Sequence, residues 1–404
     1  YIKNSAFYKY MEHISPHEAD GYNALVAGDF NGDGKDTIVV YDPFKGGLTL
    51  RERDGVDTDK LLGGIDIGND TTIAGYFNKN TLNAIQTANP NESSVHRNTA
   101  MVHLTAGDLD GDGDEELVVT ISLNDLDGGK EGDIGGNSYG QGGSTASVVA
   151  VYDKKSSGWE RVYDTQLANV FDTNHRNTKS YQGWFLRSAA SAIGDIDGNG
   201  KPEIVTVGTP ADDLRHNDDD LWRTDVMVFT VIDCDNGNYS IRMVDNDARK
   251  QHGAAAGPET VPEGWYITTD GDGKFKDWAP THSPYADNAP LSIGCVQLEG
   301  TGTTPYVFAR GHIFQFADNN GRMQFTAAQN SGNGNNKINT NLDHYLEGMH
   351  YVSQPVIANF DGNAAGRQQV FFVVGNNGTD HWIIGLTFDP SDGKKVMTGS
   401  GLYS

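Results

Sequence analysis

The segment 104–120, LTAGDLDGDGDEELVVT, decides the fold class. It joins a short apolar strand to a β-branched run through an acidic, glycine-rich loop. The same order returns at residues 24–41, ALVAGDFNGDGKDTIVVY, and at residues 191–207, SAIGDIDGNGKPEIVTV. Weaker copies occupy residues 293–308, IGCVQLEGTGTTPYVF, and residues 356–373, VIANFDGNAAGRQQVFFV. The sequence therefore predicts one structural unit that is repeated with insertions.

Further short strands, separated by turn residues, are expected after each loop. In the third unit they cover residues 203–207, 225–233 and 239–245, and Asn236-Gly237 forms a turn. In the first unit the fourth strand is expected near residues 71–77. Four strands in each unit predict an all-β protein, a β-propeller of four-stranded blades.

The predicted domain is a single propeller over residues 1–404, with blade motifs starting near residues 24, 104, 191, 293 and 356. Residues 1–20 are expected to form a linker or a ring-closing strand, for which the segment SAFYKYMEHI is suited. Alternatively, further blades lie outside this chain, so the blade number stays open.

The three strong loops have the residue types and spacing of a calcium cage. Calcium takes about six to eight oxygen ligands, and a glycine at the sixth position supplies the bend. Side chains at the first, third, fifth and ninth positions, with the carbonyl at the seventh, would supply those oxygens. The predicted ligands are Asp29, Asn31, Asp33 and the Lys35 carbonyl; Asp108, Asp110, Asp112, the Asp114 carbonyl and Glu116; and Asp195, Asp197, Asn199, the Lys201 carbonyl and Glu203.

The loops do not match an EF-hand, and the first, fourth and fifth copies match the calcium cage less closely than the other two. An EF-hand needs Glu at the twelfth position, where these loops carry Val40, Val119 and Thr206. Thr37 at the ninth position predicts a weaker first site. The fourth copy has Gln297, Glu299, Thr301 and Pro305 at the ligand positions and is expected to be metal-free, whereas the fifth, with Asn359, Asp361 and Asn363, stays ambiguous. Simple β-turns are the alternative, but three loops in phase favour about three structural calcium sites.

These units resemble FG-GAP repeats, also described as VCBS repeats, of the integrin α-chain propeller type. The segments AGDFNGDGKDTIVV, AGDLDGDGDEELVV and IGDIDGNGKPEIV carry the resemblance. It implies a propeller whose loops hold structural calcium. Members of the family include adhesion receptors, fungal lectins, bacterial surface proteins and appendages of polysaccharide lyases. Thr37, the degenerate fourth and fifth loops and the five recognisable blades depart from the family pattern.

Long insertions are expected on the face opposite the calcium loops. They lie between the second and third strands of a blade or between blades, and long loops in compact folds often carry function. Aromatic side chains beside polar ones suit sugar stacking or a protein hot spot, although they could also pack within their own loops. The candidate ligand-binding residues are Trp184, Arg215, His216, Trp222, Trp265, Trp278 and Tyr345.

Composition excludes several classes of function. A net charge of −25 disfavours nucleic acid and anionic lipid as partners. No apolar run approaches the roughly 18 residues of a membrane span. Cys234 and Cys295 are expected to be small buried hydrophobes rather than a disulfide. Nucleophile-elbow, zinc-protease, P-loop and dinucleotide motifs are missing, so no catalytic residues are predicted.

The sequence predicts an extracellular or surface-displayed protein. It starts at Tyr1 without a basic-then-apolar leader, so we expect a processed protein or an excised piece. Calcium loops with millimolar affinity fill outside cells. The expected function is ligand binding or adhesion, with a glycan or a protein held by the loop-rich face. The alternatives are a lyase-like enzyme acting on polysaccharide, and a structural or assembly module of a larger surface protein or filament.

Overall fold

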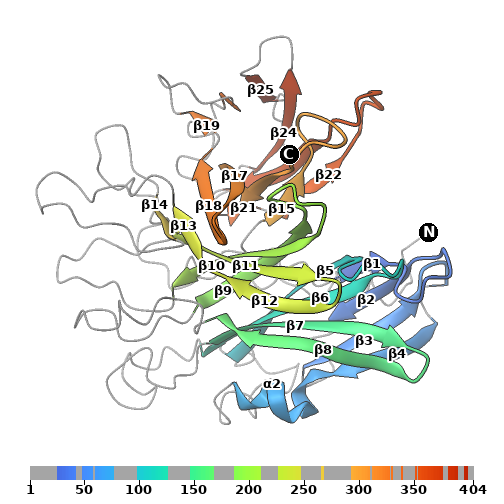
Figure 1. The fold of residues 1–404 in the computed structure, drawn as a ribbon. Helices are drawn as coiled ribbons and strands as arrows, with labels where there is room; N and C mark the ends of the chain where they lie inside the picture. Colours follow the sequence, from blue (N-terminus) through green and yellow to red (C-terminus); the bar gives the residue numbers. More distant parts are fainter. Residues whose placement is uncertain are drawn as a thin grey trace, which may run out of the picture. The chain divides into compact units, whose positions relative to one another are not determined.

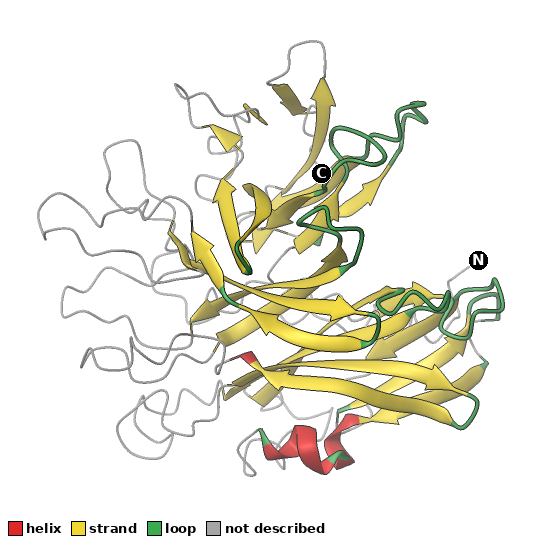
Figure 2. Ribbon diagram, viewed as in Figure 1, coloured by secondary structure: helices red, strands yellow, loops and turns green. Residues whose placement is uncertain are grey.

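The computed structural model describes the strands and the tight turns of the chain. The described residues are 25–41, 48–57, 60–76, 98–125, 146–167, 186–210, 226–246, 265–267, 293–309, 312–327, 329–330, 338–339, 351–352, 354–375, 381–389 and 395–398. Their regular structure is almost entirely β (Figure 2). Among them, no helix has the length and apolar character needed to cross a membrane.

The strands form five sheets (Figure 1). The first contains β1 (Leu25–Gly28), β2 (Thr37–Tyr41), β3 (Thr49–Asp54) and β4 (Leu61–Asp66). The second contains β5 (Asn98–Gly107), β6 (Glu116–Asp125), β7 (Ala146–Lys155) and β8 (Gly158–Gln166). The third contains β9 (Leu186–Gly194), β10 (Glu203–Pro210), β11 (Val226–Asp235) and β12 (Asn238–Arg242).

The last two sheets repeat this order. The fourth contains β15 (Ile293–Val296), β16 (Tyr306–Ala309), β17 (His312–Asn319) and β18 (Arg322–Ala327). The fifth contains β22 (Val356–Ala358), β23 (Gln369–Gly375), β24 (His381–Asp389) and β25 (Lys395–Thr398). Four antiparallel strands in chain order are the architecture of a propeller blade. The predicted fold class, all-β with five β-propeller blades, is therefore confirmed.

Short strands extend three of these sheets. They are β13 (Val244–Asn246), which lies parallel to β18; β14 (Trp265–Ile267), which pairs with β11; and β19 (Gln329–Asn330), β20 (Ile338–Asn339) and β21 (Tyr351–Val352), which belong to the fifth sheet. The single strand predicted over 239–245 is therefore wrong. It breaks at Met243, whose carbonyl accepts the N–H of Met323 at 2.8 Å, and the chain continues along the fourth sheet.

The fourth strand of the first sheet also differs from the prediction. It is β4, whereas residues 71–77 begin with the short helix α2 (Thr71–Gly75), after the 3₁₀ turn η3 (Ile67–Asn69). Asp70 explains the helix, because its Oδ1 accepts the N–H groups of Thr72 and Ile73 at 2.9 and 3.2 Å. An aspartate N-cap of this kind satisfies amide groups that a helix start leaves unpaired.

Two compact units divide the chain. The first comprises residues 1–191 with the segments 210–213 and 236–238, and the second comprises the remainder. In the first unit, fully buried Leu50, Leu104 and Val119 belong to one apolar core. In the second unit, Phe229 packs against several other phenylalanine rings. The single domain over 1–404 and the role of residues 1–20, which lie outside the described residues, stay predictions.

Candidate metal centres

Each of the five repeats has a loop between its first two strands. We call these the first loop (residues 29–37), the second loop (108–116), the third loop (195–203), the fourth loop (297–305) and the fifth loop (359–369). In the second loop Gly111 and Gly113 have φ values of 81° and 99°, which residues with a Cβ rarely adopt. Glycines at the same two positions of the third loop have φ values of 77° and 86°. This repeated backbone turns the side chains of each loop inward.

The second loop gathers five carboxylates at the end of the second sheet. Oxygens of Asp108, Asp110 and Glu116 lie within 4.8 Å of one another, and so do oxygens of Asp112, Asp114 and Glu116. Backbone N–H groups fix the geometry, since Asp108 accepts from Gly111 at 2.7 Å and Asp110 accepts from Asp112 at 3.1 Å. The spacing is that of oxygen atoms that share one cation.

Glu116, at the ninth position, is the buried carboxylate of the second loop. Its side chain is 1% exposed, and its Oε2 accepts the N–H of Leu109 at 2.6 Å. Its Oε1 is buried without a hydrogen-bond partner. A buried carboxylate oxygen without a partner is costly unless a cation or a proton satisfies it. The residues of the second loop therefore fit a hard divalent cation.

The third loop repeats this construction. Oxygens of Asp195, Asp197 and Glu203 lie within 4.8 Å of one another. Glu203 is buried and accepts the N–H of Ile196 at 2.9 Å, as Glu116 accepts that of Leu109. Asp195 accepts the N–H of Gly200 at 2.9 Å through Oδ2, and its Oδ1 is buried without a hydrogen-bond partner. The third loop also fits a cation.

Burial changes the acidity of the two glutamates. Desolvation, strengthened by Asp110, raises the pKa of Glu116 to about 8. Desolvation and Asp197 raise the pKa of Glu203 to about 8 as well. The pKa of Asp114 rises to about 6, chiefly through its hydrogen bond with Asp112. Without a cation these loops therefore hold protons at neutral pH.

The raised pKa values predict how the stability of the cation-free protein depends on pH. An acid whose pKa is higher in the folded state stabilises that state below its unfolded pKa, near 4.5, and this contribution is lost as pH rises through 8. In a chelator, the melting temperature should fall by several degrees between pH 5.5 and 8.5. Calcium binds the deprotonated carboxylates, so it should reduce that fall. Parallel thermal melts with and without calcium check this, and identical profiles would contradict it.

The first loop is built differently. Asp29 accepts the N–H of Gly34 at 2.8 Å and that of Asp33 at 3.1 Å. Thr37, at the ninth position, donates its hydroxyl to Glu52 at 3.0 Å. Glu52 is also held by Lys154 and by the indole N–H of a tryptophan, so it does not replace the absent ninth carboxylate. The first loop therefore offers fewer charged ligands than the second and the third.

In the fifth loop, oxygens at the expected ligand positions accept hydrogen bonds from a side chain of the same loop. The Asn363 amide nitrogen donates to Asn359 Oδ1, Asp361 Oδ1 and the Arg367 carbonyl at 3.1, 2.6 and 2.9 Å. The Arg367 N–H, 2.8 Å from Asn363 Oδ1, fixes the orientation of that amide. The amide nitrogen therefore lies among the oxygens that a cation would contact.

The fourth loop keeps the backbone geometry without the ligand chemistry. Gly300 and Gly302 have φ values of 117° and 82°. Gln297 accepts the hydroxyl of Thr303 at 3.1 Å, and Glu299 accepts that of Tyr306 at 2.7 Å. The side chains at its first and third positions are thus engaged in hydrogen bonds.

Most predicted ligand-binding residues lie outside the described residues. These are Trp184, Arg215, His216, Trp222, Trp278 and Tyr345. Trp265 lies in β14, where its backbone pairs with that of Val228. The described residues therefore do not test whether the candidate residues form one site, and their role stays a prediction. Cys234 and Cys295 are free cysteines; Cys234 is buried, as the sequence predicts, whereas Cys295 is only partly buried.

Sequence reasoning missed acidic residues that stand opposite the ninth loop position. Asp233 pairs with Glu203 across β10 and β11, and Asp54 pairs with Thr37 across β2 and β3. Asp153 is next to the pair formed by Leu117 and Tyr152, so it stands beside Glu116. An aspartate at the end of the third strand in these three units is the signal that could have revealed them. The Asp114 side chain was also missed, because only its carbonyl was considered.

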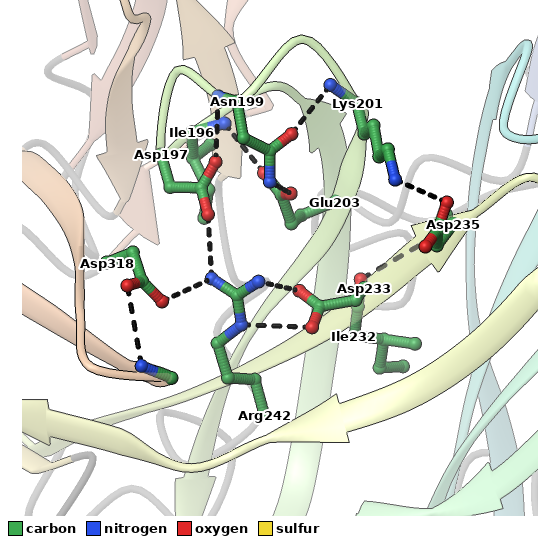
Figure 3. Close-up of polar contacts among 12 residues, drawn as sticks. Ile196, Asp197, Asn199, Lys201, Glu203, Ile232, Asp233, Asp235, Arg242 and Asp318 are labelled. Carbon is green, nitrogen blue, oxygen red and sulfur yellow. Dashed lines mark hydrogen bonds and ion pairs between the residues drawn. The ribbon is translucent and has the colours of Figure 1, made fainter.

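Arg242 was missed as well, and it lies against the third loop (Figure 3). Its Nη1 is 2.7 Å from Asp197 Oδ2, and its Nε and Nη2 each lie 2.9 Å from an oxygen of Asp233. Nη1 also lies 3.3 Å from Asp318 Oδ2. On the other side of the loop, Lys201 pairs with Asp235 at 2.5 Å.

The comparisons with known proteins leave the family open. No family model and no curated protein matches the chain. Several solved structures resemble it at low identity. A Bacillus licheniformis rhamnogalacturonan lyase is 13% identical, with a TM-score of 0.41, 95% of this chain covered and 51% of that chain. The NanB sialidase from Streptococcus pneumoniae is 8% identical, with a TM-score of 0.40, 96% of this chain covered and 61% of that chain.

A third similar structure is the Aleuria aurantia lectin, which is 10% identical, with a TM-score of 0.32, 94% of this chain covered and 77% of that chain. This chain spans about half the length of the rhamnogalacturonan lyases that it resembles. Likenesses this low say nothing about activity. The class defined by the fold and the loops is a blade-repeat protein with candidate metal centres, and the function has to be argued from those centres.

Proposed function

We propose that this protein is a calcium-stabilised β-propeller of the FG-GAP or VCBS type that binds a ligand outside the cell. One observation carries the calcium part of this proposal. The second and third loops each converge three or more carboxylates around a buried oxygen without a hydrogen-bond partner, on Glu116 and Asp195 respectively. Hard oxygen donors on a tight loop suit calcium better than softer metals.

Calcium would act here as part of the scaffold. Each loop joins the first two strands of its sheet, and the buried glutamate comes from the second of those strands. A cation held there neutralises carboxylates that otherwise repel one another, and it fixes the turn. Sites in extracellular modules have dissociation constants of about 10⁻⁴–10⁻³ M, which matches calcium outside cells and not in the cytosol. Loops of that affinity would fill outside cells, so we propose an extracellular or surface location.

Ligand binding is proposed for the end of each sheet that lies opposite its candidate metal loop. Because neighbouring strands are antiparallel, the connection from β6 to β7 leaves the end opposite the second loop, and so does the connection from β10 to β11 opposite the third. These connections are long, running over residues 126–145 and 211–225. Long connections on a rigid scaffold are where recognition residues concentrate. A glycan or a protein is the ligand class that we propose.

The calcium proposal is tested by counting sites. Isothermal titration of the chelator-treated protein with calcium chloride should show at least two sites. Asp110→Asn should remove one of them, because Asp110 belongs to the carboxylate cluster of the second loop. Asp57→Asn is the matched control, since Asp57 is exposed in another turn, and it should leave the count unchanged. Absence of calcium binding by the folded wild-type protein would refute the proposal.

The ligand proposal is tested on a glycan array, in millimolar calcium and again after chelation. Binding to a defined sugar would establish carbohydrate recognition, and release of products from that sugar would then identify a lyase-like enzyme. Silence across the array with folded, calcium-loaded protein would reject the glycan ligand. The proposal would then depend on a protein partner or on an assembly role within a larger surface protein.

A further inference from the structure

The second and third loops differ most clearly at their third position. Asp110 and Asp197 occupy this position, and in both loops Oδ1 accepts the N–H two residues further on, at 3.1 and 3.0 Å. The other oxygen of Asp197 accepts from the guanidinium of Arg242 at 2.7 Å. Among the described residues, no ion pair reaches Asp110. Asp110 and Asp197, at the same loop position, therefore differ in that only Asp197 is next to a guanidinium.

Arg242 is a fixed part of the third loop. It is held by Asp197, Asp233 and Asp318 together, and its side chain is only 13% exposed (Figure 3). Three acidic partners keep the guanidinium beside the loop, since its departure would leave the buried Asp197 carboxylate without this partner. Arginine remains charged at any ordinary pH, so this positive charge is permanent.

Among the described residues of the second sheet, no basic side chain forms an ion pair with the five carboxylates of the second loop, although Lys155 lies near enough to Asp112 and Asp114 to act on them through space. Arg161 pairs with Asp70 and Asp164, and Lys155 pairs with Asp153. Within the described part of the chain, none of the five carboxylates of the second loop is therefore shared with a cationic side chain, and the nearby Lys155 is exposed and paired with Asp153. The third loop has three carboxylates, and one of them is already shared with a guanidinium.

We propose that Arg242 is the resident cation of the third loop and lowers its affinity for calcium, so that the second loop fills first. A divalent ion in the third loop has to share Asp197 with the guanidinium and is repelled by it, and such repulsion is strong in partly buried surroundings. Arg242 is thus a residue that sets affinity without being a ligand. This inference rests on the proposed calcium function and goes beyond it.

The inference is tested in the double variant Asp29→Asn/Asp110→Asn. These substitutions impair the first and second loops and leave the third loop intact. Calcium is titrated calorimetrically into this protein with and without Arg242→Gln. Removing the guanidinium should tighten calcium binding by the third loop about tenfold or more, while the cation-free protein melts at a lower temperature. Unchanged or weaker calcium binding would overturn the inference.

Two further variants keep the test decisive if Arg242→Gln does not fold. Asp233→Asn removes a negative charge that offsets Arg242, so calcium binding by the third loop should weaken at least threefold. Arg242→Lys keeps the charge and should leave the affinity low; a tenfold gain in that variant would contradict the inference. Arg322→Gln is the matched control, because it removes a guanidinium that pairs with Asp245 at 2.5 Å, and Asp245 lies outside the third loop.

The order of filling separates this inference from the proposed function. As a single substitution, Asp110→Asn should remove the tighter phase of the wild-type calcium isotherm. Asp195→Asn alone should remove a weaker phase. If the tighter phase is lost with Asp195→Asn instead, the role of Arg242 is wrong although calcium binding stands. If the wild-type protein binds no calcium at all, the proposed function fails first.

Discussion

Removing divalent cations with a chelator is expected to lower the free energy of unfolding by about 3–5 kcal/mol relative to about 10 mM calcium. Two sites with dissociation constants of about 10⁻⁴–10⁻³ M each stabilise the folded state by about 1.4–2.7 kcal/mol at that concentration. The unfolding entropy of about 2.1 cal/mol/K per residue converts this loss to about 4–6 °C in Tm for a chain of this length. Differential scanning calorimetry measures both quantities.

The physical reason is the cost of burying carboxylates without a cation. Glu116 and Glu203 are each 1% exposed and stand among aspartates, so without a cation each must either take up a proton or stay charged in desolvated and repulsive surroundings. Magnesium at the same concentration is the control, because it demands a smaller octahedral site and keeps its waters. Magnesium should restore less of the lost stability than calcium. Equal Tm values in chelator and in calcium would contradict this prediction.

Phe229→Ala is expected to destabilise the protein by about 3–5 kcal/mol. The Phe229 ring centroid lies 4.9 Å from that of Phe314, 5.5 Å from that of Phe316 and 4.8 Å from that of Phe325. The side chain is 1% exposed, so its loss leaves a cavity and also removes three aromatic contacts. Chemical denaturation followed by circular dichroism measures the change.

Phe360→Ala is the matched control for that substitution. Phe360 is 53% exposed and makes an edge-on contact with Phe371, at 4.9 Å between centroids. Its truncation should cost less than about 1.5 kcal/mol, because little buried volume is lost. A cost at Phe229 no larger than that at Phe360 would show that the aromatic cluster is not a core of the second unit.

The repeated strands and loops could be predicted because their signals are local. The segment 104–120 combines β-branched runs with a glycine loop, and the structure has β5 and β6 there, joined by the second loop. The secondary-structure prediction was wrong where a single polar residue changed the conformation of a short segment. Asp70 starts a helix where a strand was expected, since its carboxylate caps two amide groups. Propensity alone does not reveal such a cap, because strand and helix compete closely over so few residues.

The surroundings of the loops could be predicted only in part. The carboxylates of the second and third loops follow from spacing, and the structure brings them together. Arg242 lies 45 residues from Asp197 and 76 from Asp318 along the chain, so no local pattern joins them. The Asn363 amide in the fifth loop is a similar case. Its sequence resembles a weak ligand set, and only the hydrogen bonds show an amide nitrogen among the oxygens.

The most direct test of the central claim is the effect of calcium on the Tm of a Glu116→Gln/Glu203→Gln protein. Glutamine keeps the shape of the buried side chains and can accept the bonds from Leu109 and Ile196, but it removes the charge that a cation needs. We predict that calcium raises the Tm of the wild-type protein by several degrees and leaves that of the double variant unchanged. A double variant that keeps the wild-type calcium shift would show that the second and third loops are not the metal centres.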